Sequence, residues 1–540
     1  MNNKKSTGAY YTPDYLAEFI YSRLEKNIKS LKKLSILEPS VGDGSFLNAL
    51  INKQIQNGRN ISLSAIDNNI SEISKLKKRT FKNIKIKFIY KDYLRYKPNS
   101  NELFSLVIGN PPYIRKRLLS KNQIKFGNSI HKQAELSEKT FKNIWSVFLI
   151  KSIKLLNKNG ILAFILPAEI LQVKYANELR DYILRTFKRT EIYTFSDLMF
   201  ECKGQNTIVL IGYKKHLEGG VHYIHITDIK QVKNDNIPLI KNETIQALDI
   251  KWIHHTLDSD DLKFLNNIKE TQKCVDDMCA SKPGIVTAAN SFFIIDSNTE
   301  EEYKWARYTK PILQKGSFVQ TGIVFKKTDY NKLIEEGKPI KIICINNKSI
   351  KSLNKKNIEY LLTGKEMNIP DRYKCKIRDH WTIIPNISEP CEGFYFKRSH
   401  LFPKLIKNVA NVLVTDTAYN ILMRNNYDIN SFIYSFYNSL TLVFSELSGR
   451  YYGGGVLELT PNEFKGLPIP YFGITNKEFN ELSYKFKNGN DIKDILNYTD
   501  FILLPKIGLN REQILKIQYI RDLLSLKRRR LINNSSINIL

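Results

Sequence analysis

The sequence predicts a doubly wound α/β sheet with mostly parallel strands, followed by a region of mixed α+β structure. As far as about residue 215, short apolar runs that end in glycine or polar residues alternate with helical segments. After that point this alternation of strands and helices ends, and shorter strands rich in aromatic residues are separated by turns. At 540 residues the chain is too long for one core. We therefore expect three parts, which cover residues 1–243, 244–500 and 501–540.

The first predicted strand, residues 36–38, runs into a glycine-rich turn and then into the start of a helix. Gly42 and Gly44 of this turn would let the backbone approach a ligand, and the helix start would present free N–H groups. The pattern differs from the dinucleotide-binding fingerprint, but its physics is related. We expect a ligand to lie at this turn.

Two further predicted strands lead into acidic residues. Residues 61–66 are followed by Asp67, which is placed to accept hydrogen bonds from ribose hydroxyls. Residues 84–89 lead to Asp92 and Tyr93, a hydrogen-bond acceptor for an adenine amino group beside an aromatic ring. Each carboxylate alone could be a turn or helix cap. Their order and spacing behind the glycine-rich turn favour ligand binding.

A fourth apolar run ends at Gly109 and is followed by Asn110, Pro111, Pro112 and Tyr113. The two prolines set a rigid extended backbone just past the strand. The Asn110 amide oxygen and the Pro111 carbonyl can accept both hydrogens of an exocyclic NH2 group, while Tyr113 stacks on the ring. Accepting both hydrogens draws a conjugated nitrogen toward a more reactive, pyramidal form, which suits methylation. The alternative is a plain Pro-Pro turn that leaves a buried strand.

In this order, the motifs resemble the amino-group DNA methyltransferases of the gamma arrangement, typified by the Taq adenine methyltransferase. The resemblance covers roughly residues 1–215, and residues 8–13 are similar to the family's N-terminal motif. It implies a Rossmann-like methyltransferase sheet, S-adenosylmethionine as the cofactor and duplex DNA as the partner. Residues 244–500 would then be the target recognition domain.

The resemblance also implies roles for single residues around the cofactor. Thr12 matches a threonine near the methionine moiety, and Phe148 matches an aromatic residue packed near the adenine. Asp67 stands where many relatives have Glu, which shortens the reach to the ribose. The expected cofactor-binding residues are Tyr11, Thr12, Glu38, Gly42, Gly44, Asp67, Asp92, Tyr93, Asn110 and Phe148.

Phe200, six residues before Asn206, looks like the family's phenylalanine that stacks on a flipped base. Transfer would be a direct displacement, so none of the six cysteines needs to act, and cytosine-C5 methylation is disfavoured. No metal ligand set is expected. The expected catalytic residues are Asn110, Pro111, Pro112, Tyr113 and Phe200.

The charge balance fits a polyanionic partner. The chain carries 83 Lys and Arg residues against 53 Asp and Glu residues, a formal net charge of +30. The sequence is also rich in Lys, Asn and Ile, so part of this charge could be compositional drift. The polar start, the lack of a membrane-span pattern and the scattered cysteines predict a cytoplasmic protein.

Three later segments could contact DNA or serve structure alone. Residues 362–366 resemble a segment of recognition domains in related restriction-modification methylases. Residues 449–461 hold three consecutive glycines, which would let the backbone approach DNA or form a tight strand connection. Residues 501–540 are expected to form a basic amphipathic helix packed on the recognition domain. Its charges at 527–530 would touch phosphate or stabilise the helix end.

The sequence thus predicts a site-specific DNA adenine-N6 methyltransferase, either an orphan or paired with a separately encoded restriction endonuclease. One alternative keeps the chemistry and acts on ribosomal RNA or a protein glutamine. Another is a DNA specificity module without catalysis. The long region after the catalytic motifs favours DNA over the first alternative, and the complete motif set argues against the second.

Overall fold

The contacts of the chain divide it into two compact units, and each is described by itself. The first contains residues up to Leu262 together with 532–540, and the second runs from Lys263 to Leu531. The boundary predicted after residue 243 falls outside the described residues. The computed structural model describes residues 11–28, 33–53, 55, 60–81, 84–99, 102–195, 207–226, 232, 240–242, 252, 257, 259–319, 322–452 and 455–529.

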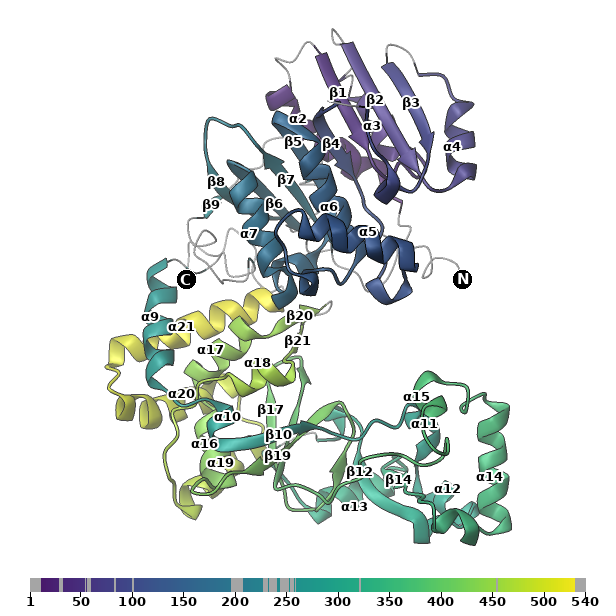
Figure 1. Cartoon of the computed structure of the whole chain (residues 1–540). Coiled ribbons are helices and arrows are strands. Elements are labelled where there is room, and N and C mark those ends of the chain that lie inside the picture. The colour runs from purple at the N-terminus through teal and green to yellow at the C-terminus, as the bar shows by residue number, and fades with distance from the viewer. Residues whose placement is uncertain are drawn as a thin grey trace. The chain divides into compact units, whose positions relative to one another are not determined.

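The first unit is built on a nine-stranded sheet with the order β3-β2-β1-β4-β5-β7-β6-β8-β9 (Figure 1). The neighbours from β3 to β5 are parallel, and β7 lies antiparallel between β5 and β6. The predicted doubly wound, mostly parallel α/β fold is confirmed. The strands are β1 (Lys33–Glu38), β2 (Asn60–Asp67), β3 (Ile84–Tyr90), β4 (Phe104–Gly109), β5 (Leu156–Pro167), β6 (Arg189–Phe195), β7 (Thr207–Tyr213), β8 (Gly220–Ile226) and β9 (Ile240–Asn242).

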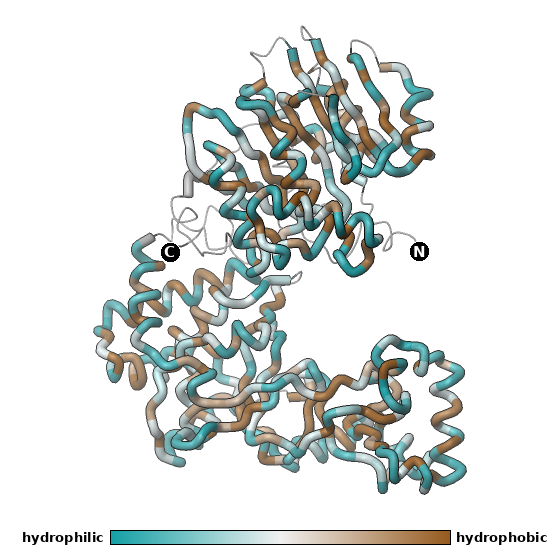
Figure 2. Tube along the Cα trace, viewed as in Figure 1, coloured by the Kyte–Doolittle hydropathy of each residue, from teal (hydrophilic) through white to brown (hydrophobic). Residues whose placement is uncertain are grey.

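Helices cover both faces of this sheet and form two hydrophobic cores. On β4, Leu106 and Ile108 point into one core while Val107 points into the other. A strand that is buried on both faces reads as a continuous apolar run, which is why Figure 2 shows hydrophobic stretches along these strands. The helices are α2 (Asp14–Ile28), α3 (Ser45–Asn52) and α4 (Ile70–Lys77) at one core, α6 (Ile144–Leu155) and α7 (Asn177–Thr186) at the other, and α5 (Lys121–Lys132).

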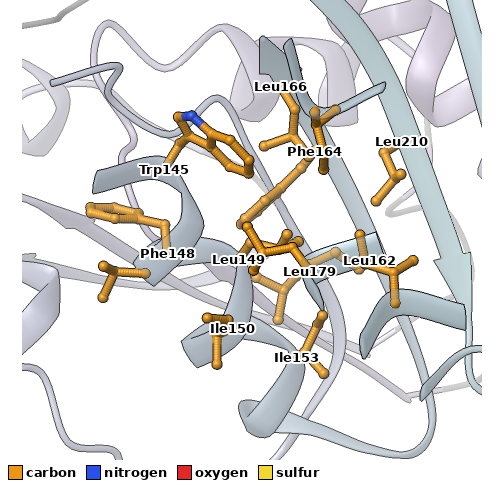
Figure 3. Packing of buried hydrophobic residues seen from close by; sticks show 14 of the residues in the cluster. Trp145, Phe148, Leu149, Ile150, Ile153, Leu162, Phe164, Leu166, Leu179 and Leu210 are labelled. Carbon is orange, nitrogen blue, oxygen red and sulfur yellow. The ribbon is translucent and has the colours of Figure 1, made fainter. Parts of the chain in front are cut away.

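Helix α6 is apolar nearly all round because it lies against the centre of the sheet. Trp145, Leu149 and Ile153 belong to the same core as Leu162 and Phe164 of β5 (Figure 3). The Trp145 indole N–H donates a hydrogen bond to Glu169 at 3.1 Å, which satisfies its polar end. The helix is therefore a rigid support for whatever lies at its N-terminal end.

The second unit has mixed α+β structure. Its five-stranded sheet contains β10 (Cys279–Pro283), β19 (Ala418–Met423), β15 (Gly393–Phe396), β17 (Lys404–Asn408) and β13 (Val324–Phe325). Smaller sheets contain β11 (Ile294–Ile295), β14 (Lys341–Ile343), β12 (Thr309–Leu313) and β18 (Leu413–Val414), and β16 (Arg398–Ser399), β21 (Val456–Glu458) and β20 (Arg450–Tyr452). The helices are α9 (Ser259–Thr271), which contains the point of division, α10 (Val275–Met278), α11 (Asn290–Phe293), α12 (Ser297–Glu302), α13 (Lys327–Glu335), α14 (Lys355–Glu366), α15 (Tyr373–Lys376), α16 (Ile429–Phe436), α17 (Ser439–Ser448), α18 (Pro461–Lys465), α19 (Asn476–Lys487), α20 (Ile492–Leu503) and α21 (Arg511–Arg528).

Helix α21 buries the isoleucines and leucines that repeat at helical spacing. Arg528, one of the basic residues at the end of this helix, has a different role from the one that the sequence predicts. The Arg528 side chain is buried and donates hydrogen bonds from Nε to both carboxylate oxygens of Glu446 in α17, at 3.0 and 2.8 Å. Its Nη1 donates to the His400 carbonyl at 2.7 Å. Arg528 is therefore an internal ion-pair partner rather than a phosphate contact or a solvated helix-end charge.

Candidate active site

A cavity of about 730 Å³, including its open mouth, lies where the parallel strands of the first unit end. This is the edge at which open α/β sheets bind their ligands. The cavity is lined by Tyr11, Pro39, Ser40, Gly42, Asp67, Asn68, Lys91, Asp92, Tyr93, Asn110, Pro112, Ile114, Gln123, Ile144 and Phe148. The turns after four neighbouring strands, β3, β2, β1 and β4, thus meet at one site.

The two glycines predicted to approach a ligand have different local functions. Gly42 lines the cavity at φ +52°, and a Cβ atom there would lie 3.3 Å from a ring carbon of Tyr11. Gly44 caps the start of α3 at φ +87°, where a Cβ atom would lie 2.7 Å from a methyl group of Leu76. Both positions disfavour a side chain. Gly42 therefore shapes the cavity wall, whereas Gly44 permits close packing of α3 and α4.

Asp67 at the end of β2 ties two turns together. Its Oδ2 accepts a hydrogen bond from the Gly42 N–H at 2.9 Å, and its Oδ1 accepts one from the Asn69 N–H at 2.8 Å. Burial raises the pKa of the Asp67 carboxyl, and the backbone hydrogen bonds oppose that rise. Each carboxylate oxygen can accept a further hydrogen bond. Asp67 can therefore bind a hydroxyl in the cavity while it holds the glycine turn.

Asp92 after β3 is fixed from two directions. Its Oδ1 accepts from the Leu94 N–H at 2.9 Å and caps a single 3-10 turn, η1 (Tyr93–Arg95). Its Oδ2 accepts from the Gln123 side-chain amide of α5 at 3.3 Å. Gln123 closes a capping box with Ser120, a signal that is readable in the sequence as S-x-x-Q. The carboxylate is thus oriented before any ligand binds.

Two aromatic rings form an apolar wall of the cavity. The ring centroids of Tyr93 and Phe148 lie 4.8 Å apart at an interplanar angle of 41°. The Tyr93 hydroxyl forms a 2.9 Å hydrogen bond with the Ser152 hydroxyl of α6, which also carries Phe148. A flat heterocycle could lie against this wall with its amino group at Asp92.

Glu38 at the end of β1 is buried, and among the described residues neither of its carboxylate oxygens has a hydrogen-bond partner. Burial raises the pKa of this carboxyl well above its usual range, and the nearby carboxylates of Asp43 and Asp67 raise it further. A buried acceptor without a donor is costly. A cationic amino group is the kind of ligand that would satisfy it.

Asn110 is held by polar contacts on both sides. Its Nδ2 donates to the Thr12 hydroxyl at 3.3 Å, and its Oδ1 accepts from the Tyr113 hydroxyl at 3.0 Å. The Tyr113 hydroxyl also lies 3.1 Å from the Ile165 carbonyl, which is a second acceptor for its proton. Tyr113 is only 8% exposed and does not line the cavity. Tyr113 positions Asn110 in this structure, and its stacking on a target base stays a prediction.

The predicted residues separate into three groups. Tyr11, Gly42, Asp67, Asp92, Tyr93, Asn110, Pro112 and Phe148 line the cavity, whereas Thr12, Glu38, Gly44, Pro111 and Tyr113 do not. Phe200 lies outside the described residues. The lining residues that were not predicted are Pro39, Ser40, Asn68, Lys91, Ile114, Gln123 and Ile144.

Among the described residues, no cluster of His, Cys, Asp and Glu side chains could hold a metal ion. The helices described are all too short or too polar to cross a bilayer.

Two family models match the chain. Residues 17–200 match the Eco57I restriction-modification methylase family, and residues 249–504 match the C-terminal domain of Type II methyltransferase M.Eco57I. The predicted resemblance to restriction-modification methylases is therefore confirmed, whereas the gamma arrangement stays a prediction.

Individual relatives agree with these matches. The chain is 24% identical to Type II methyltransferase M.AccI of Acinetobacter calcoaceticus, over 94% of both chains. It is 28% identical to Type II methyltransferase M.HincII of Haemophilus influenzae, over 46% of this chain and 43% of that relative. The Type IIL restriction-modification enzyme MmeI, solved in complex with DNA, shares the fold at a TM-score of 0.60 and 12% identity, over all of this chain and 78% of MmeI.

Proposed function

We propose that this chain, a restriction-modification DNA methyltransferase with S-adenosylmethionine as its cofactor, methylates the amino nitrogen of adenine at a specific site in duplex DNA. The observation that carries the proposal is the single cavity that joins two kinds of group. Asp92 and Tyr93 suit a bound adenosine, and Asn110 suits a target amine. The match of residues 249–504 to the C-terminal domain of a Type II methyltransferase favours DNA over RNA or protein as the substrate.

The residues that line the cavity, together with the buried Glu38 at the end of β1, fit the parts of the cofactor in turn. Asp67 would accept the ribose hydroxyls, and Asp92 would accept the adenine amino group beside the Tyr93 and Phe148 rings. Glu38 would bind the cationic amino group of the cofactor, because its buried carboxylate oxygens have no hydrogen-bond donor among the described residues. When bound, S-adenosylmethionine supplies a methyl group on a positively charged sulfur.

Asn110 would accept a hydrogen of the target amine. Its orientation is set because Nδ2 donates to Thr12, so the carbonyl oxygen points away from that contact. The Tyr113 hydroxyl can give its proton to Ile165 alone when the amine takes the Asn110 oxygen, since both acceptors lie within 3.1 Å. The lone pair of the amine nitrogen would form the new bond to the methyl carbon as the carbon–sulfur bond breaks, which would leave a neutral thioether, and the surplus proton of the nitrogen would pass to solvent. This route needs no cysteine nucleophile.

We also propose that the target adenine is flipped from the duplex and stacked by Phe200. The protein would work in a bacterial or archaeal cytoplasm on nucleoid DNA. A cognate restriction endonuclease would be encoded separately. The region that follows the catalytic domain would act as the specificity domain, with α21 as part of it.

The test is methylation by the purified full chain with methyl-labelled S-adenosylmethionine. The substrates are DNA from a host without adenine methylation, ribosomal RNA and a protein extract. We expect label in DNA only, recovered as N6-methyladenine at one sequence, and none with Asn110→Ala. Label recovered as N4-methylcytosine, or label in RNA or protein, would overturn the proposed substrate.

A further inference from the structure

Lys151 of α6 reaches the 3-10 turn that follows Asp92. Its Nζ donates hydrogen bonds to three backbone carbonyls of this turn, Tyr93 at 2.6 Å, Leu94 at 3.0 Å and Tyr96 at 2.6 Å. An ammonium has three N–H donors, so each carbonyl receives one. Three carbonyls within four residues of one turn therefore surround a single cation.

The same ammonium lies 4.9 Å from the centre of the Tyr93 ring. On its other sides, Tyr93 contacts the Phe148 ring and donates to or accepts from the Ser152 hydroxyl. Phe148, Lys151 and Ser152 all belong to α6, which is anchored in the core beneath. One helix therefore fixes both the ring and the backbone of the turn that forms the adenine side of the cavity.

We infer that Lys151 is a positioning residue for the cofactor: its ammonium holds the turn from Asp92 to Tyr96 in the conformation that binds adenine. Lys151 does not line the cavity, so it acts through Asp92 and Tyr93 rather than by contact with the cofactor. The inference deepens the proposed cofactor site. It adds a residue that the motifs did not point to, because the three carbonyls it serves lie 55 to 58 positions away in the chain.

The ammonium form is needed for this function. A neutral amine has two N–H donors and would leave one of the three carbonyls without its hydrogen bond. Burial lowers the pKa of Lys151 to about 8; the Asp92 carboxylate opposes this change, and the Lys91 and Lys97 ammonium groups add to it. Lys151 therefore begins to lose its proton just above neutral pH. Cofactor affinity should fall with that loss.

The first experiment measures S-adenosylmethionine binding by calorimetry at pH 7 for the full chain and three variants. Lys151→Met removes the ammonium and keeps the stem, and we expect about tenfold weaker binding with a saturated methylation rate within about twofold of the native rate. Lys151→Arg keeps a cation and should recover part of the affinity. Lys154→Met, which removes an exposed lysine from the same helix, should leave binding unchanged.

The second experiment repeats the measurement at pH 9. Because the amino group of the cofactor also titrates in this range, affinities are compared as ratios between proteins at each pH. With a pKa of about 8, the tenfold gap between native protein and Lys151→Met should narrow to about twofold at pH 9. Relative to Lys151→Arg, the native affinity should fall about fivefold. This comparison needs only native protein and the arginine variant, so it remains decisive if Lys151→Met does not fold.

Two outcomes would overturn the inference. One is that Lys151→Met binds S-adenosylmethionine at pH 7 as tightly as the native protein does. The other is that the ratio of cofactor affinities between native protein and Lys151→Arg does not change with pH. Asp92→Ala separates this failure from failure of the site itself. If Asp92→Ala loses binding while Lys151→Met keeps it, the cofactor site stands and Lys151 is only a buried lysine. If both keep native binding, the cofactor site is wrong.

Discussion

Replacing Asp92 tests the adenine side of the site most directly. In Asp92→Ala the cofactor loses an ionised acceptor for its amino group, and a hydrogen bond to a charged group contributes about 1.5–3 kcal/mol. Binding should therefore weaken by about ten- to 150-fold. DNA binding should change far less, because no phosphate contact is assigned to this residue.

The structure adds a second effect that must be separated from the first. The Asp92 Oδ1 also caps the turn Tyr93–Arg95 through the Leu94 N–H, and loss of a cap costs about 1 kcal/mol of folding free energy. A domain of this size would then unfold about 2–4 °C lower. Asp92→Asn is the matched control, since its amide oxygen can keep the cap while its NH2 group cannot accept from adenine.

The assay is calorimetric titration with S-adenosylmethionine, paired with thermal unfolding of each apoprotein. We expect both variants to lose affinity, whereas Asp92→Ala loses more thermal stability than Asp92→Asn, which gives up the Gln123 hydrogen bond but keeps the cap. Native affinity in Asp92→Asn would refute the reasoning, because the carboxylate would then serve the turn alone.

Three further predictions concern other parts of the chain. Asn110→Ala should abolish methyl transfer and leave cofactor and DNA affinity nearly unchanged, as measured by single-turnover kinetics beside binding titrations; an equal loss of DNA affinity would contradict its role in the transition state. A duplex with 2-aminopurine at the target should brighten on binding, and Phe200→Ala should slow methylation while Phe200→Trp keeps much of the rate, because stacking on a base is worth about 1–3 kcal/mol; a native rate in Phe200→Ala would reduce Phe200 to core packing. Arg528→Met should lower the free energy of unfolding by about 3–5 kcal/mol in urea titrations, because it leaves Glu446 buried without its ion-pair partner; a double variant that also carries Glu446→Gln should regain part of that loss, and equal stability of single and double variants would show that the pair is not coupled.

The sequence predicts the cavity residues that directly follow strands. Gly42, Asp67, Asp92 and Asn110 could be placed because the carboxyl ends of parallel strands meet at one edge of the sheet. Apolar runs fix where each strand ends, so the position of the next polar residue follows from local pattern alone.

Residues that reach the site from helices could not be predicted in the same way. Gln123 and Lys151 act on the Asp92 turn only because α5 and α6 pack beside it, and packing geometry has no local signature. Burial of Arg528 was missed for a related reason: a basic helix end is usually solvated, and its partner Glu446 lies 82 positions earlier in the chain. The orientation of Tyr113 depends on Ile165 of β5, which a motif cannot specify.

Among the described residues, the Glu38 carboxyl has no hydrogen-bond partner. The number of protons that this group holds would therefore change when a cationic ligand binds beside it. Burial keeps this group protonated at pH values where the unfolded chain has it ionised, so Glu38 holds a proton in the ligand-free fold that it lacks in the unfolded chain. The contribution of Glu38 to stability therefore declines as the pH rises above the pKa of this group in the unfolded chain. A cationic amino group beside Glu38 would expel that proton and take over its charge-balancing role. Each binding event would then exchange one positive charge for another, leaving the interior of the domain electrically unchanged.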